Sequence, residues 1–203
     1  MIRVPPGRAG RQWLRHRVDT ARNAAELLKR KLLILEQRHH HLWTRARECR
    51  ESWELAARQA RQWVDRAVLT GGLRGLRLSA PRESAEVTLT WDTVMGTRYP
   101  VATSCAPPRT PPGATVLTGA VWTEANVAHR RALEAAVDCA AAAEALRIVE
   151  LEIATTRRRV RALDHRWIPG LEATLSELDA SLEELERAEH LTRHWASGQD
   201  PSR

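Results

Sequence analysis

Histidines and carboxylates lie next to each other at three places where acid–base or metal chemistry would be conceivable. His39-His40-His41 are consecutive, and Asp164-His165 and Glu189-His190 each pair a carboxylate with an imidazole. On a helix, three successive side chains point about 100° apart, so the three histidines do not converge on one metal ion. We expect His39 to pack at a helix seam and the other two histidines to face solvent.

The other reactive residue types form no catalytic set either. No phosphate-binding GxxxxGKS loop is present, and Glu183-Glu184-Glu186 reads as the solvated face of a helix. Cys49, Cys105 and Cys139 are an odd number and widely spaced, which gives neither a disulfide framework nor zinc-ligand spacing. The sequence therefore predicts a protein that is not an enzyme, with no cofactor and no metal.

The elements that carry these residues are two long helices. Uncharged residues recur at alternating steps of four and three from Leu14 to Ala67, and again from Ala125 to Trp167. A 3.5-residue period held this long is typical of supercoiled helices, which bury one stripe against a partner. Trp53 and Trp63 also fall on this stripe, and we expect these two and Trp167 to be packing residues.

The chain divides into three parts by composition. Residues 1–78 form the first helix, which is expected to stop at Thr70-Gly71-Gly72, with a frayed continuation beyond it. Residues 79–121 contain two alternating stretches, 85–92 and 95–101, that suit a β-hairpin, and a proline-rich loop over 105–113. A two-stranded ribbon alone is marginal in water, so it should lean on the helices. Residues 122–203 form the second helix.

The second helix is expected to open at Thr123 as its N-cap and to contain one irregularity. From Trp167 the apolar positions continue to Leu171 and Leu175, two steps of four in succession, which is a stutter that unwinds a supercoil. Pro169 lies inside it, removes a backbone donor and predicts a bend. A complete break into two shorter helices is the alternative.

Two long helices separated by a short insert predict an all-α fold, an antiparallel two-helix coiled coil with the β-hairpin in the middle. Pairing the two ends places Leu14 beside Trp195. In this register Cys49 lies near Val160, far from Cys139, so no disulfide is expected between the two cysteines.

Charge is uneven along the chain. Residues 1–78 hold 18 Lys and Arg against 7 Asp and Glu, whereas residues 79–203 hold 14 against 18. Two helices of complementary charge lying side by side explain this pattern. The competing explanation is a basic surface for nucleic acid, but the arginines are spread around the helix and form no compact block. The start of the chain lacks an apolar signal-peptide region, and no 18-residue window is free of charge, so neither secretion nor direct membrane insertion is expected.

Two segments resemble one family. Residues 158–175, RRVRALDHRWIPGLEATL, resemble the RRVNALE…IP.LE.TI signature of the D subunit of V-type and archaeal A-type ATPases, and 182–189, LEELERAE, resemble its LEE.ERe stretch. At the other end, Pro5-Pro6-Gly7-Arg8 stands where the family has a PTR-type lead-in, and 27–31, LLKRK, fit its LLK.K pattern. The chain departs from the family at Asp164-His165-Arg166, which is more polar than the usual run.

This resemblance implies a non-catalytic central rotor shaft that transmits torque between the catalytic ring and the membrane rotor. Implied partners are the A and B subunits of the hexamer, the small F subunit, and the subunit that links the stalk to the rotor ring. The implied location is cytoplasmic, as a peripheral part of a membrane complex. We expect the partner interfaces to include the following residues: Arg8, Arg11, Arg15, Arg187 and Arg193 near the joined termini, and Val87 and Tyr99 in the middle segment.

Three alternatives remain. A gamma-type subunit of F-type synthases has a central domain that needs far more room than residues 79–121 offer. A generic coiled-coil scaffold or adaptor explains the heptads but does not require Pro169. A basic nucleic-acid-binding rod predicts steeply salt-dependent binding to DNA.

Overall fold

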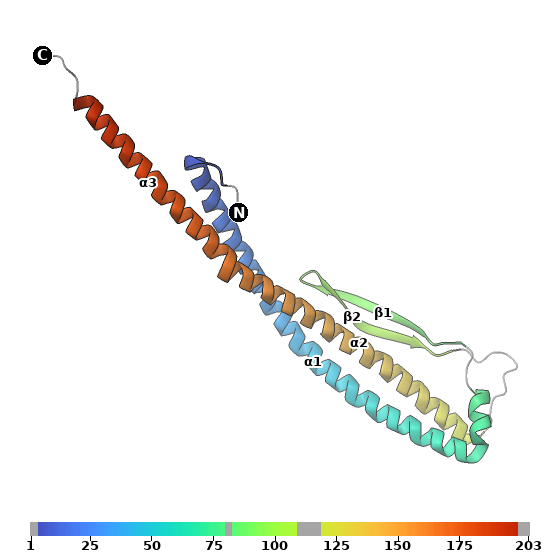
Figure 1. Cartoon of the computed structure of the whole chain (residues 1–203). Helices are drawn as coiled ribbons and strands as arrows, with labels where there is room; N and C mark the ends of the chain where they lie inside the picture. Colours follow the sequence, from blue (N-terminus) through green and yellow to red (C-terminus); the bar gives the residue numbers. More distant parts are fainter. Residues whose placement is uncertain (1–3, 80–82, 109–118, 199–203) are drawn as a thin grey trace. The chain divides into compact units, whose positions relative to one another are not determined.

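The computed structural model describes residues 4–79, 83–108 and 119–198. Within them the chain is almost entirely helical, apart from one pair of strands (Figure 1). The elements are α1 (Gly7–Ser79), β1 (Glu86–Val94), β2 (Thr97–Ala106), α2 (Ala120–Ala162), the π-helix η1 (Leu163–Trp167) and α3 (Ile168–Gly198). The predicted all-α class with a central β-hairpin is confirmed.

The chain divides into two compact units, residues 1–32 with 154–203 and residues 33–153. In the first unit the start of α1 packs antiparallel against α3. Leu14, Val18 and Ala21 of α1 form a buried cluster with Leu171 of α3. Because these are the uncharged residues of the seam, their burial is what holds this unit together.

The second unit pairs the rest of α1 with α2, again antiparallel. Large buried residues are few here, and small ones fill much of the contact. The buried seam residues are Leu35, Leu42, Ala60 and Ala67 of α1 and Ala125, Ala142, Ala145, Val149 and Ile153 of α2. Alanine has only a methyl group as its side chain, so two helix backbones can approach closely along such a stripe.

The register of the two helices differs from the predicted one. Leu14 packs in a cluster that includes Leu175 and Leu178, not beside Trp195, and Arg8 of α1 pairs with Glu186 of α3. The offset is about 17 residues, or roughly 25 Å along a helix at 1.5 Å per residue. The prediction was wrong because heptad spacing repeats along each helix and leaves many registers equally apolar. Aligning the two ends was an assumption that no residue enforced.

The predicted irregularity near Pro169 is a π-helix rather than a helix break. In η1 the N–H of Ile168 bonds to the carbonyl of Leu163, five residues back instead of four. Pro169 has no N–H and its ring would crowd the carbonyl of residue 165 in an α-helix, so a wider turn before it relieves the clash. The helical run therefore passes through Pro169, and the alternative of two separate helices is wrong.

The π-turn also changes which residues enter the seam. Stepping by four and three predicts Trp167 at the seam, but Trp167 is 45% exposed, and Ile168 packs against the Leu14 cluster instead. In the structure, successive seam residues are therefore five positions apart from Leu163 to Ile168 and three positions apart from Ile168 to Leu171. Trp53 is likewise exposed, so the predicted packing role is wrong for Trp53 and Trp167, whereas Trp63 is partly buried.

Glycines mark the break in α1 and the start of α2. Gly72 has φ 67° and ψ 173°, outside helical values, which confirms a break at Thr70-Gly71-Gly72 with a helical continuation to Ser79. α2 begins at Ala120, directly after Gly119, and not at Thr123. The backbone N–H of Thr123 already bonds to the carbonyl of Gly119, so Thr123 lies inside the first turn and is not its N-cap.

The β-hairpin forms where alternation predicted it, with slightly longer strands. β1 and β2 pair antiparallel around a turn at Met95-Gly96, and a bulge interrupts the register between Thr90 and Trp91. In Figure 1 the hairpin lies along α2 within the second unit. The proline-rich loop predicted over 105–113 begins later than expected, because Cys105 and Ala106 still belong to β2. Residues 109–113 of the predicted loop lie outside the described residues.

The observed register makes a prediction about the cysteines. His39 contacts Glu150, so ten residues further along α1 Cys49 is expected close to Cys139 on α2. In a Cys105→Ala variant we expect a short bismaleimide to join Cys49 and Cys139 within one chain, detected by mass spectrometry after proteolysis. In the end-aligned register Cys49 and Cys139 lie about 20 residues, or roughly 30 Å, apart. Two separate single adducts and no cross-link would therefore contradict the observed register.

Candidate partner-binding surfaces

A row of ion pairs joins α1 to α3 and η1 in the first unit. Every cation comes from the basic first helix and every carboxylate from the acidic second one, which confirms the predicted complementary charge. The pairs are Arg8–Glu186 at 2.8 Å, Arg11–Asp179 at 2.8 Å, Arg15–Asp179 at 3.9 Å, Arg22–Glu172 at 2.6 Å and Lys29–Asp164 at 3.2 Å. Hydrogen bonds to Asp164 and Glu26 raise the pKa of Lys29 above its ordinary value.

The arginines expected at a partner interface are part of this charge pattern. Arg8 and Arg15 are exposed and Arg11 is partly buried, and all three form ion pairs with carboxylates of α3. Arg187 pairs with Glu183 at 3.4 Å, one turn earlier on the same helix, and Arg193 pairs in the same way with Glu189. The sequence places these residues near the termini correctly, but it does not reveal that each already has a carboxylate neighbour.

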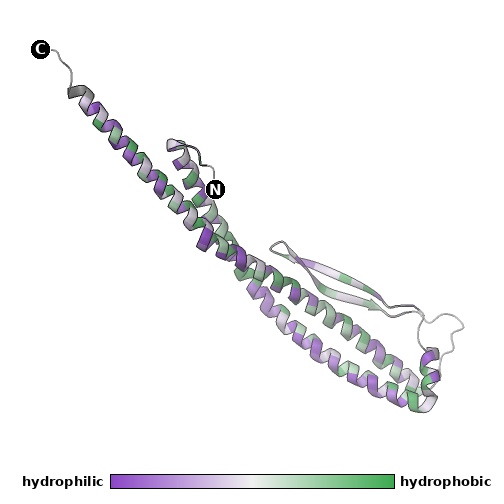
Figure 2. Ribbon diagram, viewed as in Figure 1, coloured by the Kyte–Doolittle hydropathy of each residue, from purple (hydrophilic) through white to green (hydrophobic). Residues whose placement is uncertain are grey.

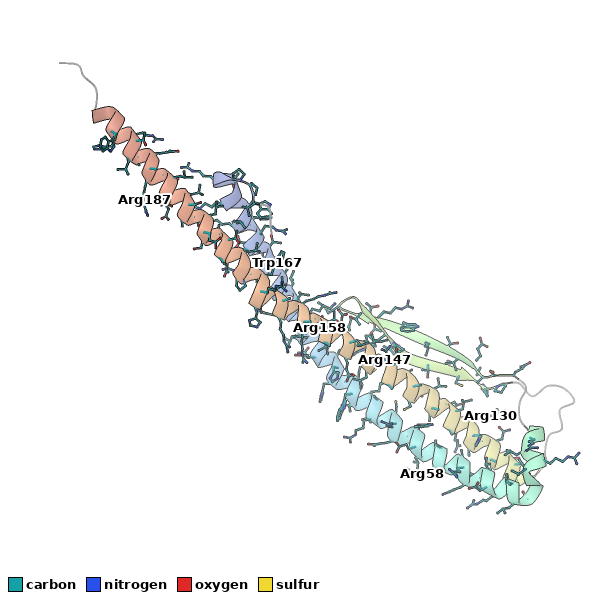
Figure 3. The ribbon with its side chains drawn as sticks, in the orientation of Figure 1. Arg58, Arg130, Arg147, Arg158, Trp167 and Arg187 are labelled. Atoms are coloured by element: carbon teal, nitrogen blue, oxygen red, sulfur yellow. The ribbon has the colours of Figure 1, made fainter. Side chains whose placement is uncertain are left out.

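The last turns of α3 extend past the residues that α1 pairs with. Glu186 faces Arg8 near the start of α1, and the helix continues to Gly198. Leu191 and Trp195 are largely exposed in this stretch. Arg187 projects from this part of the helix (Figure 3). Among the described residues of this unit, none covers most of the Leu191 or Trp195 side chain.

A buried tyrosine anchors the β-hairpin to α1. Tyr99 is 1% exposed, and its hydroxyl accepts a hydrogen bond from Arg38 Nε at 2.7 Å and donates one to Asp92 at 3.2 Å. The Arg38 guanidinium also lies over the Tyr99 ring, 5.3 Å from its centroid. A second contact joins Thr103 of β2 to Asp138 of α2. The expectation that the ribbon leans on the helices is confirmed.

The two residues expected at a partner surface in this segment have different roles. Tyr99 is buried in the anchor, whereas Val87 on β1 is exposed. Val87 is joined on the hairpin by other exposed apolar side chains, namely Leu89, Trp91 and Met95. Tyr99 therefore positions the hairpin, and the exposed apolar residues of the hairpin are the part that a partner could contact.

The histidine run has no convergent geometry. His39 is half-buried, and its Nε2 lies 3.1 Å from Glu150 Oε1 on α2. The rings of His40 and His41 are edge to face, with centroids 6.2 Å apart. Among the described residues no group of three or more His, Cys, Asp or Glu side chains is placed to hold a metal ion.

Polar and apolar residues alternate around each helix. Figure 2 shows both kinds along the full length of α1, α2 and α3, with no wholly apolar helix. Of the helices in the described ranges, none has the length and apolar character needed to cross a membrane.

Comparison with known families agrees with the motifs in the sequence. The model of the family described as the D subunit of ATP synthase matches residues 11–197, which span both units and the hairpin. The chain belongs to the ATP synthase D-subunit family. The match covers the antiparallel helices as well as the middle segment, so the relationship is not confined to one motif.

Individual D-subunit relatives are similar over nearly their whole length. An A-type ATP synthase D subunit from Methanopyrus kandleri is 31% identical over 191 residues, which are 91% of this chain and 81% of that protein. A V-type ATP synthase D subunit from Acetivibrio thermocellus is 29% identical over 204 residues, 95% of this chain and 89% of the relative. An A-type ATP synthase D subunit from Thermococcus gammatolerans is 29% identical over 192 residues, which are 92% of this chain and 90% of that protein.

Some residues that shape these surfaces gave no signal in the sequence of this D-subunit chain. Arg38 and Asp92, which hold Tyr99, lie 54 residues apart and fit no motif. Their pairing depends on how the hairpin folds back, which local pattern does not encode. The π-turn did have a signal, because the stutter and Pro169 coincide.

The Tyr99 anchor gives a prediction about pH. Burial raises the pKa of Tyr99 above its ordinary value of 10.0, and the hydrogen bond from Arg38 only partly opposes this. Because the folded pKa is the higher one, Tyr99 stabilises the fold below pH 10 and this contribution is lost as pH rises further. Tyr99 is the only tyrosine of the chain, so tyrosinate absorbance reports it directly, with a midpoint expected above 10.

The matched control is Tyr99→Phe, which keeps the ring and removes the hydroxyl. We expect this variant to be less stable to urea by about 1–2 kcal/mol at neutral pH and to lose less stability than the parent above pH 10. A tyrosinate midpoint at or below 10 in the folded protein would contradict the anchor.

Proposed function

We propose that this D-subunit chain is the central rotor shaft of a V/A-type rotary ATPase or ATP synthase. It transmits torque between the catalytic A/B ring and the membrane rotor and is not itself catalytic. The observation that carries this proposal is the family match over residues 11–197, which follows the antiparallel helices from one end to the other. A generic scaffold or adaptor would not account for that match.

The packing suits a part that carries load. In each unit the seam is a continuous stripe of uncharged residues, and in the first unit a row of ion pairs flanks it. The apolar stripe supplies cohesion, and sliding one helix past the other would break each charged pair and misalign the buried layers. Such an arrangement resists shear along the helices.

The partners are assigned to the exposed surfaces. We assign the end of α3 with Arg187 and Arg193, together with Arg8, Arg11 and Arg15 at the start of α1, to the A and B subunits of the catalytic hexamer. The exposed apolar residues of the hairpin, including Val87 and positioned by Tyr99, are assigned to the small F subunit. The subunit that links the stalk to the rotor ring is the remaining partner. The proposed location is the cytoplasmic side of the membrane complex.

Affinity purification of the tagged chain from its own organism tests the shaft function. We expect recovery of an ATP-hydrolysing complex that contains A-type and B-type subunits and a small subunit. Leu14→Asp buries a charge in the first unit and should abolish this recovery, whereas Leu27→Asp, at a position 64% exposed, should not. Recovery of the parent chain alone, or with partners that hydrolyse no ATP, would contradict the proposal.

Pro169 carries a second test of the same function. We propose that Pro169, with the π-turn before it, bends the shaft and that this asymmetry helps to force the three catalytic sites into different states. Pro169→Ala restores a backbone donor and removes the ring clash, so the helix should regain regular α-geometry. The expected result is fewer ions moved per ATP hydrolysed by the reconstituted complex. An unchanged ratio would rule out this role for Pro169.

A further inference from the structure

An arginine-rich stretch surrounds the π-turn. Residues 157–166 contain five arginines and one carboxylate, Asp164, which is held by Lys29. Arg158, Arg159, Arg161 and Arg166 are all exposed. Within the described part of the chain none of these four guanidinium groups forms an ion pair, and the hydrogen bond from Arg158 goes to the Thr155 hydroxyl. By contrast, each of the arginines near the chain termini forms an ion pair, namely Arg8, Arg11, Arg15, Arg187 and Arg193.

The π-turn brings these arginines together. In an α-helix, residues three or four apart are neighbours, and a residue five apart points elsewhere. Across a π-turn the residue five positions on takes the place that the fourth has in an α-helix. Arg158, Arg161 and Arg166 therefore follow one another along one row of the helix surface.

A second row lies beside the first. Arg159 is three residues before Ala162, and Trp167 is five residues after Ala162 across the same π-turn. The turn that removes Trp167 from the seam thus places it next to the arginines as an exposed aromatic side chain. Arg158 and Trp167 both extend from the helical run in Figure 3. We call Arg158, Arg159, Arg161, Arg166 and Trp167 the π-turn patch.

We propose that the π-turn patch is a docking surface for a carboxylate-rich segment of another protein. Guanidinium groups bind carboxylates through two parallel hydrogen bonds, and Arg and Trp are the residue types most enriched where protein interfaces gain their energy. Four unpaired cations next to an aromatic ring are complementary to acidic side chains on a short helix or loop. The proposal does not depend on the rotor function.

The surroundings of the patch favour a short acidic segment over nucleic acid. From Arg158 to Arg166 the cations extend roughly 12 Å at 1.5 Å per residue. Acidic residues follow in the next turns, at Glu177 and at Glu172, which pairs with Arg22, and Glu152 precedes the patch on α2. A long polyphosphate would have to pass these carboxylates, whereas a segment with a few clustered carboxylates fits between them.

The chain contains a matched control for the experiment. Arg58, Arg61 and Arg66 of α1 have the same spacing as Arg158, Arg161 and Arg166 and are also exposed, but they lie in an α-helix without a π-turn. In a regular α-helix Arg66, five residues after Arg61, does not lie in the same row as Arg61. The two triple variants, R58Q/R61Q/R66Q and R158Q/R161Q/R166Q, therefore remove equal charge.

Binding of a fluorescent oligoglutamate peptide to the full chain, followed by anisotropy, tests the proposal. We expect R158Q/R161Q/R166Q to weaken binding about tenfold and R58Q/R61Q/R66Q to weaken it less than about twofold. Trp167→Ala should also weaken binding, and Trp43→Ala, at a tryptophan that is 46% exposed beside Arg47, should not. Circular dichroism checks that each variant keeps its helix content.

Two results would overturn the proposal. Equal losses in the two triple variants would mean that peptide binding follows net charge and not the patch. Tighter, patch-dependent binding of a DNA duplex of equal charge, or of vesicles with anionic lipid, would assign the patch to a different class of partner. Both probes are measured with the same variants.

Discussion

Burial of one uncharged stripe between antiparallel helices is the interaction on which this protein depends. Each helix is highly charged on its remaining surface, so only the stripe can exclude water. Burying one Leu or Val side chain contributes about 1.5–3 kcal/mol, whereas an exposed ion pair contributes about 0–1 kcal/mol. The cluster around Leu14 and Leu171 therefore supplies the stability of the first unit, and the flanking ion pairs help to select one register among several apolar ones.

The hairpin shows how a marginal element becomes useful on such a scaffold. Two strands alone bury too little surface to be stable in water. A single buried tyrosine, held by Arg38 and Asp92, fixes the ribbon to α1, and a contact to Asp138 fixes it to α2. The helices thus hold in place a segment whose apolar side chains Val87, Leu89 and Trp91 stay exposed.

One proline has consequences for both the inside and the outside of the first unit. Pro169 cannot complete an α-helical ladder, and the π-turn before it adds one residue to the turn. On the inside, Ile168 takes the seam position that periodicity gives to Trp167. On the outside, the same shift exposes Trp167 and aligns three arginines. The backbone geometry around Pro169 therefore determines which side chains lie on the surface of the π-turn.

Local spacing and contiguous motifs were enough to predict the two long helices, the hairpin between them, the irregularity at Pro169 and the family. Tertiary structure alone decided the register, the partners of Arg8 and Arg11, and the burial of Tyr99. A heptad pattern looks the same after every shift of seven residues, so it states that a stripe will be buried but not against which residues. That choice is made by contacts between side chains far apart in the chain, which no local pattern contains.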